Sequence, residues 1–125
     1  MDHLHRIRVD GCHDRRIEAG RAASALKDLA QQLGVPVVAP AQVARAGRHE
    51  GAGSESGWKG PRRWHLKESG DIEQEADTIL MLHRDVGTQD LVTQVLIDKV
   101  RQGEEGGQVR LEFDHMTRKL REVTW

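Results

Sequence analysis

Residues 67–85 read KESGDIEQEADTILMLHRD, and this stretch indicates the fold more clearly than any other part of the 125-residue chain. Its first half is acidic and follows Ser69 and Gly70, two residues that favour the start of a helix, where the helix dipole stabilises carboxylates. The apolar run Thr78–His83 is expected to form a buried strand. A helix that leads directly into a buried strand is typical of an α/β fold.

The residues before this stretch predict another helix and another strand. From Asp14 to Leu33 apolar residues recur every three or four positions, which indicates an amphipathic helix. Asp14 is a suitable N-cap, and Gly34 with Pro36 supplies a stop signal. The apolar run Val35–Ala41 does not alternate with polar residues. We therefore expect it to be a strand buried on both faces of a parallel sheet.

The C-terminal third predicts an antiparallel meander. Leu91–Val100 and Gln108–Asp114 have strand-like patterns, and glycines between them favour a turn. Arg118–Val123 is expected to add a short edge strand after a turn at residues 115–117. The predicted fold class is therefore α/β, with a mostly parallel sheet that ends in an antiparallel hairpin.

The formal net charge of -1 conceals two blocks of opposite charge. Residues 45–67 contain six basic and two acidic residues, whereas residues 68–90 contain seven acidic residues and one basic residue. The five glycines of the basic block predict a mobile loop over residues 44–67. This loop is either a linker or a DNA contact in which Trp58 and Trp64 stack on bases.

Several classes of protein and site do not fit the composition. No apolar run reaches the roughly 18 residues of a membrane span, and the N-terminus lacks the apolar stretch of a secretory signal. Cys12 is the single cysteine, so an internal disulfide is excluded. The spacing of Cys12 from the histidines near it fits no standard zinc finger. We therefore expect a cytoplasmic protein with no membrane partner.

Residues 67–85 resemble the R-E-S-G-x-I-E-Q-D-A-D stretch of the DnaB family, hexameric replicative DNA helicases with a RecA-like motor domain. RecA-like repair ATPases match this acidic block less well. Other segments follow in the order of the family's own motifs, namely Asp2–Leu4 (end of the Walker B strand), Val35–Arg45 (S-Q-L-x-R), Asp98–Gly103 (K-x-R-N-G) and Val109–Val123 (the closing hairpin). The resemblance implies that residues 1–125 form the C-terminal part of a RecA-like (P-loop NTPase) helicase ATPase domain.

The resemblance also implies roles at a nucleotide site. Asp2 matches the Walker B acid that holds Mg²⁺. Gln42 matches the residue that senses the γ-phosphate, although the family's preceding serine is Ala41 here. Lys99 and Arg101 match the pair that reaches a neighbouring subunit's ATP as an arginine finger. Because they are two apart on a predicted strand, both side chains are expected on one face.

A DNA site is implied as well. Lys67, Glu68 and Gly70 match the segment that lines the family's central channel and contacts single-strand phosphates without reading sequence. The partners implied for the complete enzyme are single-stranded DNA, further copies of the chain in a hexamer, a primase and a helicase loader. ATP and Mg²⁺ are its implied cofactors.

No G-x-x-x-x-G-K-[ST] motif occurs in the sequence, and the family's catalytic glutamate between Walker A and Walker B is also missing. The isolated chain is therefore expected to bind no cofactor and to hydrolyse no ATP. One hypothesis is that the chain is part of an ATP-dependent replicative helicase that translocates 5'-3' on single strands as a ring. The alternative is a non-catalytic remnant that binds single-stranded DNA or helicase subunits without motor activity.

Overall fold

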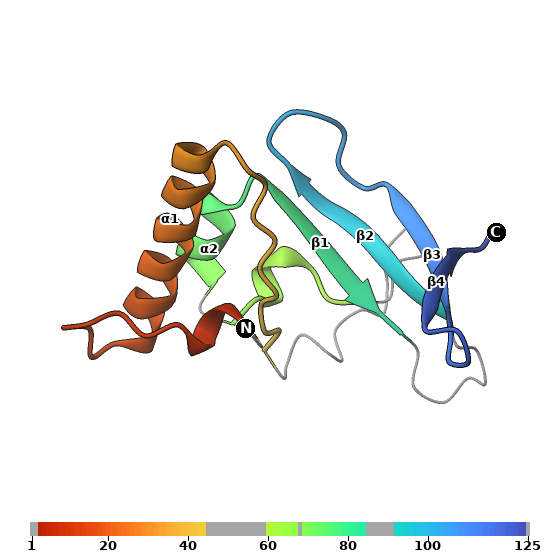
Figure 1. Ribbon diagram of the computed structural model, residues 1–125, viewed down its shortest axis with the longest axis horizontal. Coiled ribbons are helices and arrows are strands. Elements are labelled where there is room, and N and C mark those ends of the chain that lie inside the picture. The colour runs from red at the N-terminus through yellow and green to blue at the C-terminus, as the bar shows by residue number, and fades with distance from the viewer. Residues whose placement is uncertain (1–2, 45–59, 68, 85–91, 125) are drawn as a thin grey trace.

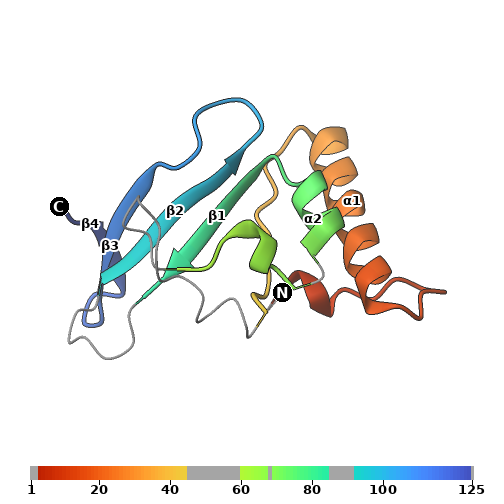
Figure 2. The same ribbon diagram turned by 180° about the vertical axis from the view of Figure 1, so that it is seen from behind.

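A computed structural model describes residues 3–44, 60–67, 69–84 and 92–124 (Figure 1). Its elements in chain order are η1 (Leu4–Arg6), α1 (Arg15–Leu33), η3 (Arg63–His65), α2 (Ser69–Glu75), β1 (Thr78–His83), β2 (Val92–Val100), β3 (Gln108–Asp114) and β4 (Lys119–Glu122). Figures 1 and 2 show α1 and α2 side by side at one end of the molecule, with the sheet extending away from them. In the described part of the chain, no helix is both long and apolar enough to cross a membrane.

Helix α1 begins and ends where its sequence predicts. A carboxylate oxygen of Asp14 accepts a hydrogen bond of 2.8 Å from the backbone N–H of Arg16, so Asp14 is the N-cap. Gly34 ends the helix in the left-handed conformation, with φ of 63°. On the buried face, Gly20 lets α2 approach closely, because a Cβ added there would lie 2.8 Å from the Cβ of Asp71.

A buried carboxylate ties the segment before α1 to the helix. Glu18 accepts a hydrogen bond of 3.1 Å from the backbone N–H of Val9 and pairs with Arg8 and Arg15 at 3.3 and 3.4 Å. The Val9 hydrogen bond, assisted by the two arginines, lowers the pKa of Glu18. The buried charge is therefore satisfied, as a structural carboxylate should be.

The four strands form one sheet in the order β1-β2-β3-β4, and every neighbouring pair is antiparallel. The predicted bounds of these strands agree with the structure to within a few residues, except that Leu91 lies outside the described residues. The prediction of a mostly parallel sheet is wrong for the described residues. The segment that was expected to supply a parallel strand does not join the sheet.

That segment, Val35–Ala41, forms no strand. The prediction that it is a buried strand of a parallel sheet is therefore wrong. Val38 is 93% exposed, and only Ala39 and Ala41 pack against the core. Pro36 and Pro40 have no N–H to donate to a neighbouring strand. Its described backbone hydrogen bonds to the rest of the molecule run from Leu4 N–H to the Pro40 carbonyl at 2.7 Å and from Val35 N–H to the Ala30 carbonyl at 3.1 Å. Apolar composition alone therefore does not make this segment a strand.

Strand β1 is buried on one face only, whereas its sequence suggested burial on both. Ile79 and Met81 are buried, but Leu80 and Leu82 are each more than half exposed. The exposed Leu80 and Leu82 lie on the second face, which the described residues leave largely uncovered. The pattern is that of a half-buried antiparallel strand.

Glycines shape the first turn of the meander, and an aspartate stabilises the second. Gly103 and Gly106 have positive φ angles of 150° and 89° between β2 and β3. Between β3 and β4, the carboxylate of Asp114 accepts hydrogen bonds from Met116 N–H at 2.8 Å and from the Thr117 hydroxyl at 2.7 Å. The hydrogen bonds from Thr117 and Met116 lower the pKa of Asp114.

Part of the predicted basic loop is ordered into the fold. Residues 45–59, which include Trp58, lie outside the described residues. Residues 60–67, in contrast, contain the turn η3 and a backbone bridge between Leu66 and Val43. Leu66 also joins the hydrophobic core, whose buried members are Leu4, Ala19, Ala22, Leu66, Ile72, Ile79, Met81 and Leu96. Residues 60–67 therefore pack against the rest of the fold, whereas the mobility of the block stays a prediction.

Candidate functional site

The pairing of β1 with β2 is interrupted next to the predicted finger residues. Ile79 pairs with Lys99 and Leu80 with Ile97, so Asp98 is an extra residue without a partner on β1. Such a β-bulge bends a strand and redirects the side chains beside it. The bulge therefore determines the direction in which β2 presents Asp98 and Lys99.

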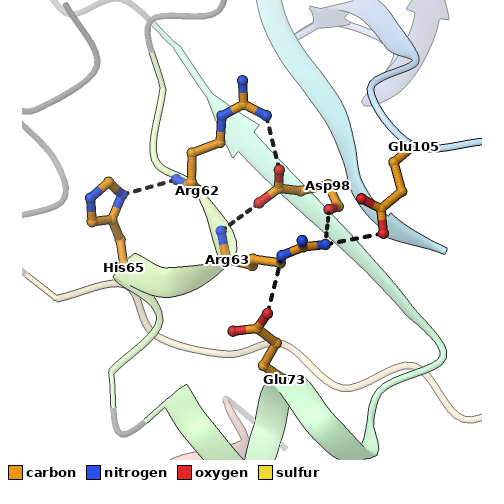
Figure 3. Close-up of polar contacts among 6 residues, drawn as sticks. All are labelled: Arg62, Arg63, His65, Glu73, Asp98 and Glu105. Carbon is orange, nitrogen blue, oxygen red and sulfur yellow. Dashed lines mark hydrogen bonds and ion pairs between the residues drawn. The ribbon is translucent and has the colours of Figure 1, made fainter. Parts of the chain in front are cut away.

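The Asp98 side chain joins this bulge to η3 (Figure 3). Its carboxylate is 5% exposed, and it accepts hydrogen bonds from the guanidinium of Arg62 at 2.9 Å and from the backbone N–H of Arg63. The Arg62 backbone N–H in turn donates to Nδ1 of His65 at 3.0 Å, which closes the turn. One of these bonds is charge-assisted and the other comes from the backbone, so the buried carboxylate holds β2 and η3 together.

Arg63 contacts three parts of the molecule at once. Its Nη1 donates to the Asp98 carbonyl at 2.7 Å and to a carboxylate oxygen of Glu105, in the β2–β3 connection, at 3.1 Å. Its Nε pairs with the Glu73 carboxylate of α2 at 3.1 Å. Figure 3 shows these contacts around one guanidinium. Arg63 thus holds η3, α2 and the end of β2 together.

The two predicted finger residues both reach the C-terminal end of α2. Lys99 Nζ donates to the Glu73 carbonyl, and Arg101 Nη2 donates to the Gln74 carbonyl at 2.9 Å. The last carbonyls of a helix have no partner within the helix, and the dipole favours cations there. Their two-residue spacing correctly placed the side chains on one face.

Asp77 orients Arg101 from the other side. Arg101 Nε lies 3.3 Å from Oδ1 of Asp77, and the Arg101 backbone N–H donates to the Asp77 carbonyl at 2.8 Å. The second carboxylate oxygen accepts a hydrogen bond from Lys27 of α1. This hydrogen bond, with the nearby charges of Lys27 and Arg101, lowers the pKa of Asp77. Asp77 is therefore a shared anion between α1 and the end of β2.

Gln42 and Lys67, predicted for different sites, are neighbours in the structure. The Lys67 backbone N–H donates to the Gln42 carbonyl at 2.8 Å, and the Ala44 N–H donates to the His65 carbonyl at 2.8 Å. The His5 ring lies between them, with Nε2 at 2.8 Å from the Lys67 carbonyl. Both predicted site residues are exposed. The predicted phosphate sensor is thus joined by backbone hydrogen bonds to the predicted DNA-contact segment.

Of the remaining predicted site residues, Gly70 occupies the second position of α2, and Asp2 and Glu68 lie outside the described residues. Within residues 3–44, 60–67, 69–84 and 92–124, no group of three or more acidic, histidine or cysteine side chains could hold a metal ion. The Mg²⁺ role of Asp2 therefore stays a prediction.

The contacts of Arg63, Asp98 and Asp77 had no sequence signal of their own. Asp77 lies within the acidic stretch that indicated the fold, but nothing in the spacing connects it to Lys27, which is 50 positions away. Asp98 lies within an expected strand, and a bulge becomes visible only once the partner strand is placed.

Comparison with known proteins identifies the family. The family model described as "DnaB-like helicase C terminal domain" matches residues 1–122. The chain belongs to this family. The resemblance to DnaB helicases that the sequence motifs indicated is thereby confirmed.

Individual DnaB relatives match most of the chain but are much longer. The replicative DNA helicase DnaB of Haemophilus influenzae is 37% identical over 120 residues, which cover 91% of this chain and 24% of that protein. The DnaB of Treponema pallidum is 38% identical over 114 residues, covering 90% and 23%. The chain thus spans about a quarter of the length of these curated relatives.

Solved DnaB-type structures share the fold. The ATPase domain of G40P superposes with a TM-score of 0.77 at 27% identity, over 94% of this chain and 41% of that one. A DnaB-like replicative helicase, described together with its interactions with primase, gives 0.74 at 28% identity, over 91% and 27%. The described residues therefore correspond to part of a RecA-like ATPase domain.

Proposed function

We propose that this chain is the C-terminal part of the motor domain of a DnaB-like replicative helicase, which as a ring translocates 5'-3' on single-stranded DNA and unwinds duplex DNA. The family match over residues 1–122 and the 37% identity with a replicative helicase support a helicase role. Since the chain spans about a quarter of such relatives, the activity belongs to a longer protein.

The observation that carries this proposal is the arrangement around α2. Lys99 and Arg101 lie together at its C-terminal end, and Lys67 and Gly70 lie at its start. In the proposed ring, the two cations reach the ATP of a neighbouring subunit and stabilise the charge that develops during hydrolysis. Lys67, Glu68 and Gly70 contact the phosphates of single-stranded DNA, and Gln42 senses the γ-phosphate.

The proposed enzyme needs groups that this chain alone does not supply. ATP and Mg²⁺ belong to the complete motor domain, where Asp2 would be a Mg²⁺ ligand. Without a phosphate-binding loop, the isolated chain neither binds nor hydrolyses ATP. Its proposed partners are single-stranded DNA, further copies in a hexamer, a helicase loader and a primase. A structure of a DnaB-like helicase that describes its interactions with primase supports the last of these.

A chimera tests the proposal. The aligned 120 residues of the Haemophilus influenzae helicase are replaced by this chain, and ATP hydrolysis and fork unwinding are measured. We expect both activities, and we expect Arg101→Ala to reduce hydrolysis by about 10³-fold or more while nucleotide binding persists. Arg121→Ala, which removes an exposed arginine from β4, is the matched control and should leave turnover unchanged. Full turnover in Arg101→Ala would overturn the finger assignment.

A second candidate function is a non-catalytic remnant that binds single-stranded DNA or helicase subunits. The observation that favours it is the missing G-x-x-x-x-G-K-[ST] motif. Fluorescence anisotropy of labelled oligo-dT with the 125-residue chain measures DNA binding separately from turnover. A chimera without hydrolysis, combined with DNA binding by the chain alone, would favour the remnant over the motor.

A further inference from the structure

We propose that Arg63 is a positioning residue that couples contact with single-stranded DNA to the placement of Lys99 and Arg101. This inference rests on the proposed function, because it connects the proposed DNA-contact segment with the proposed finger. Figure 3 shows Arg63 with Asp98 and Glu73, the two residues through which we infer the coupling.

The first step is the short path from Arg63 to the DNA-contact segment. Arg63 begins η3, and Lys67 follows this turn directly after Leu66, which is buried in the core. The Lys67 backbone is fixed by its hydrogen bond to the Gln42 carbonyl. A displacement of Lys67 by a bound phosphate therefore also displaces η3, because no free loop separates them.

The second step is the connection from Arg63 to β2. Its backbone N–H and its Nη1 bind the carboxylate and the carbonyl of Asp98, the residue immediately before Lys99. Because Asp98 is the extra residue of the bulge, it has no pairing to β1 that would resist displacement. The next residues of β2 keep their pairs, Lys99 with Ile79 and Val100 with Thr78, so a shift of η3 acts on β2 through Asp98.

The third step is a closed set of contacts through α2. Arg63 Nε binds the Glu73 carboxylate, and the carbonyl of the same Glu73 accepts the hydrogen bond from Lys99 Nζ. Arg63 and Lys99 are thus linked both through Asp98 and through Glu73. The Arg101 guanidinium binds the next carbonyl, that of Gln74. Both cations are thus held by carbonyls at the end of α2, so a movement of α2 changes where they are placed.

The test uses nuclear magnetic resonance of the 125-residue chain titrated to saturation with short oligo-dT. Wild type is expected to show shifts of the Lys67 and Gly70 amides on DNA binding, together with shifts of the Lys99 and Arg101 amides. In Arg63→Ala the first pair of shifts should remain, and the second pair should fall to less than about half of its wild-type size. A merely structural role would alter both pairs or neither. Arg121→Ala, an arginine distant from η3, should keep both.

A second variant tests the same coupling if Arg63→Ala does not fold. Glu73→Gln removes the charge that Arg63 binds on α2, and it leaves the contacts of Arg63 with Asp98 in place. It should also weaken the shifts at Lys99 and Arg101. Shifts at Lys99 and Arg101 that are as large in either folded variant as in wild type would overturn the coupling alone. So would a wild-type chain that shows shifts at Lys67 and Gly70 but none at Lys99 and Arg101. Absence of any shift at Lys67 and Gly70 would overturn the proposed DNA contact and the coupling with it.

Discussion

Replacing Asp98 by alanine should destabilise the fold by about 3 kcal/mol. The carboxylate is 5% exposed and accepts hydrogen bonds from the Arg62 guanidinium and the Arg63 backbone N–H. Removing one partner of a buried ion pair typically costs about 3–5 kcal/mol. The Arg62 side chain is 25% exposed and can be partly hydrated once its partner is lost, so the lower end of this range applies. Asp98→Asn keeps one acceptor and should cost about 1.5–3 kcal/mol, the value of one lost charged hydrogen bond.

Urea unfolding followed by circular dichroism measures this loss. A chain of 125 residues has a typical stability of about 6–19 kcal/mol, so the variant should still fold. The unfolding midpoint should fall by about 1–3 M urea at an unchanged m value. The matched control is Asp28→Ala, which removes an exposed carboxylate from α1 and should change stability by less than about 0.5 kcal/mol.

A loss below about 1 kcal/mol in Asp98→Ala would refute the reasoning. It would mean that η3 is not anchored to β2 through this carboxylate, and the Arg63 coupling would lose its connection to β2. An equal loss in Asp98→Asn and Asp98→Ala would show that the negative charge, rather than the two separate acceptor oxygens, dominates the anchor.

Three further predictions concern the parts of the fold that support the site. Gly20→Ala should lower the thermal unfolding midpoint, because the steric cost of about 1–3 kcal/mol against Asp71 outweighs a gain of about 1 kcal/mol in helix propensity. An unchanged or higher midpoint would contradict the close approach of α1 and α2. Leu96→Ala, at a side chain that is 1% exposed, should cost about 2–5 kcal/mol in urea unfolding, and a loss under about 1 kcal/mol would place β2 outside the core. The pKa of Asp77 is lowered from 3.8 in the folded chain, so its contribution to stability is present above pH 3.8 and is lost as the pH falls through the lower folded value. Unfolding measured across this acid range should therefore show a smaller pH dependence in Asp77→Asn than in wild type, and identical slopes would argue against the Lys27 and Arg101 contacts.

Features set by neighbouring residues in the chain could be predicted from the sequence. The caps of α1 at Asp14 and Gly34 depend on local hydrogen bonds and backbone conformation, and both were correct. The glycines before β3 were placed correctly for the same reason. Lys99 in β2 and Arg101 directly after it both reach α2, in agreement with the shared face that their two-residue spacing predicts.

Features set by distant parts of the chain could not be predicted in this way. Val35–Ala41 has strand-like composition, but a strand needs a neighbour with which to exchange hydrogen bonds, and composition does not specify one. Burial of β1 depends on what covers each face, so its apolar run was compatible with one buried face or two. The bulge at Asp98 is a property of two strands together. The DnaB motifs named the residues, and the structure added the contacts of Arg63, Asp77 and Asp98 around them.

The order of the strands in the sheet has a consequence for how the chain folds. Each of the strands β1, β2 and β3 pairs with the strand that follows it in the sequence. Closing such connections costs little chain entropy compared with pairing remote segments, and folds dominated by local pairings form quickly. We expect the meander to assemble early and to present the bulge at Asp98 before η3 docks on it. In that order of events, η3 docks on the sheet after the bulge has formed, through the contacts of Arg62 and Arg63 with Asp98.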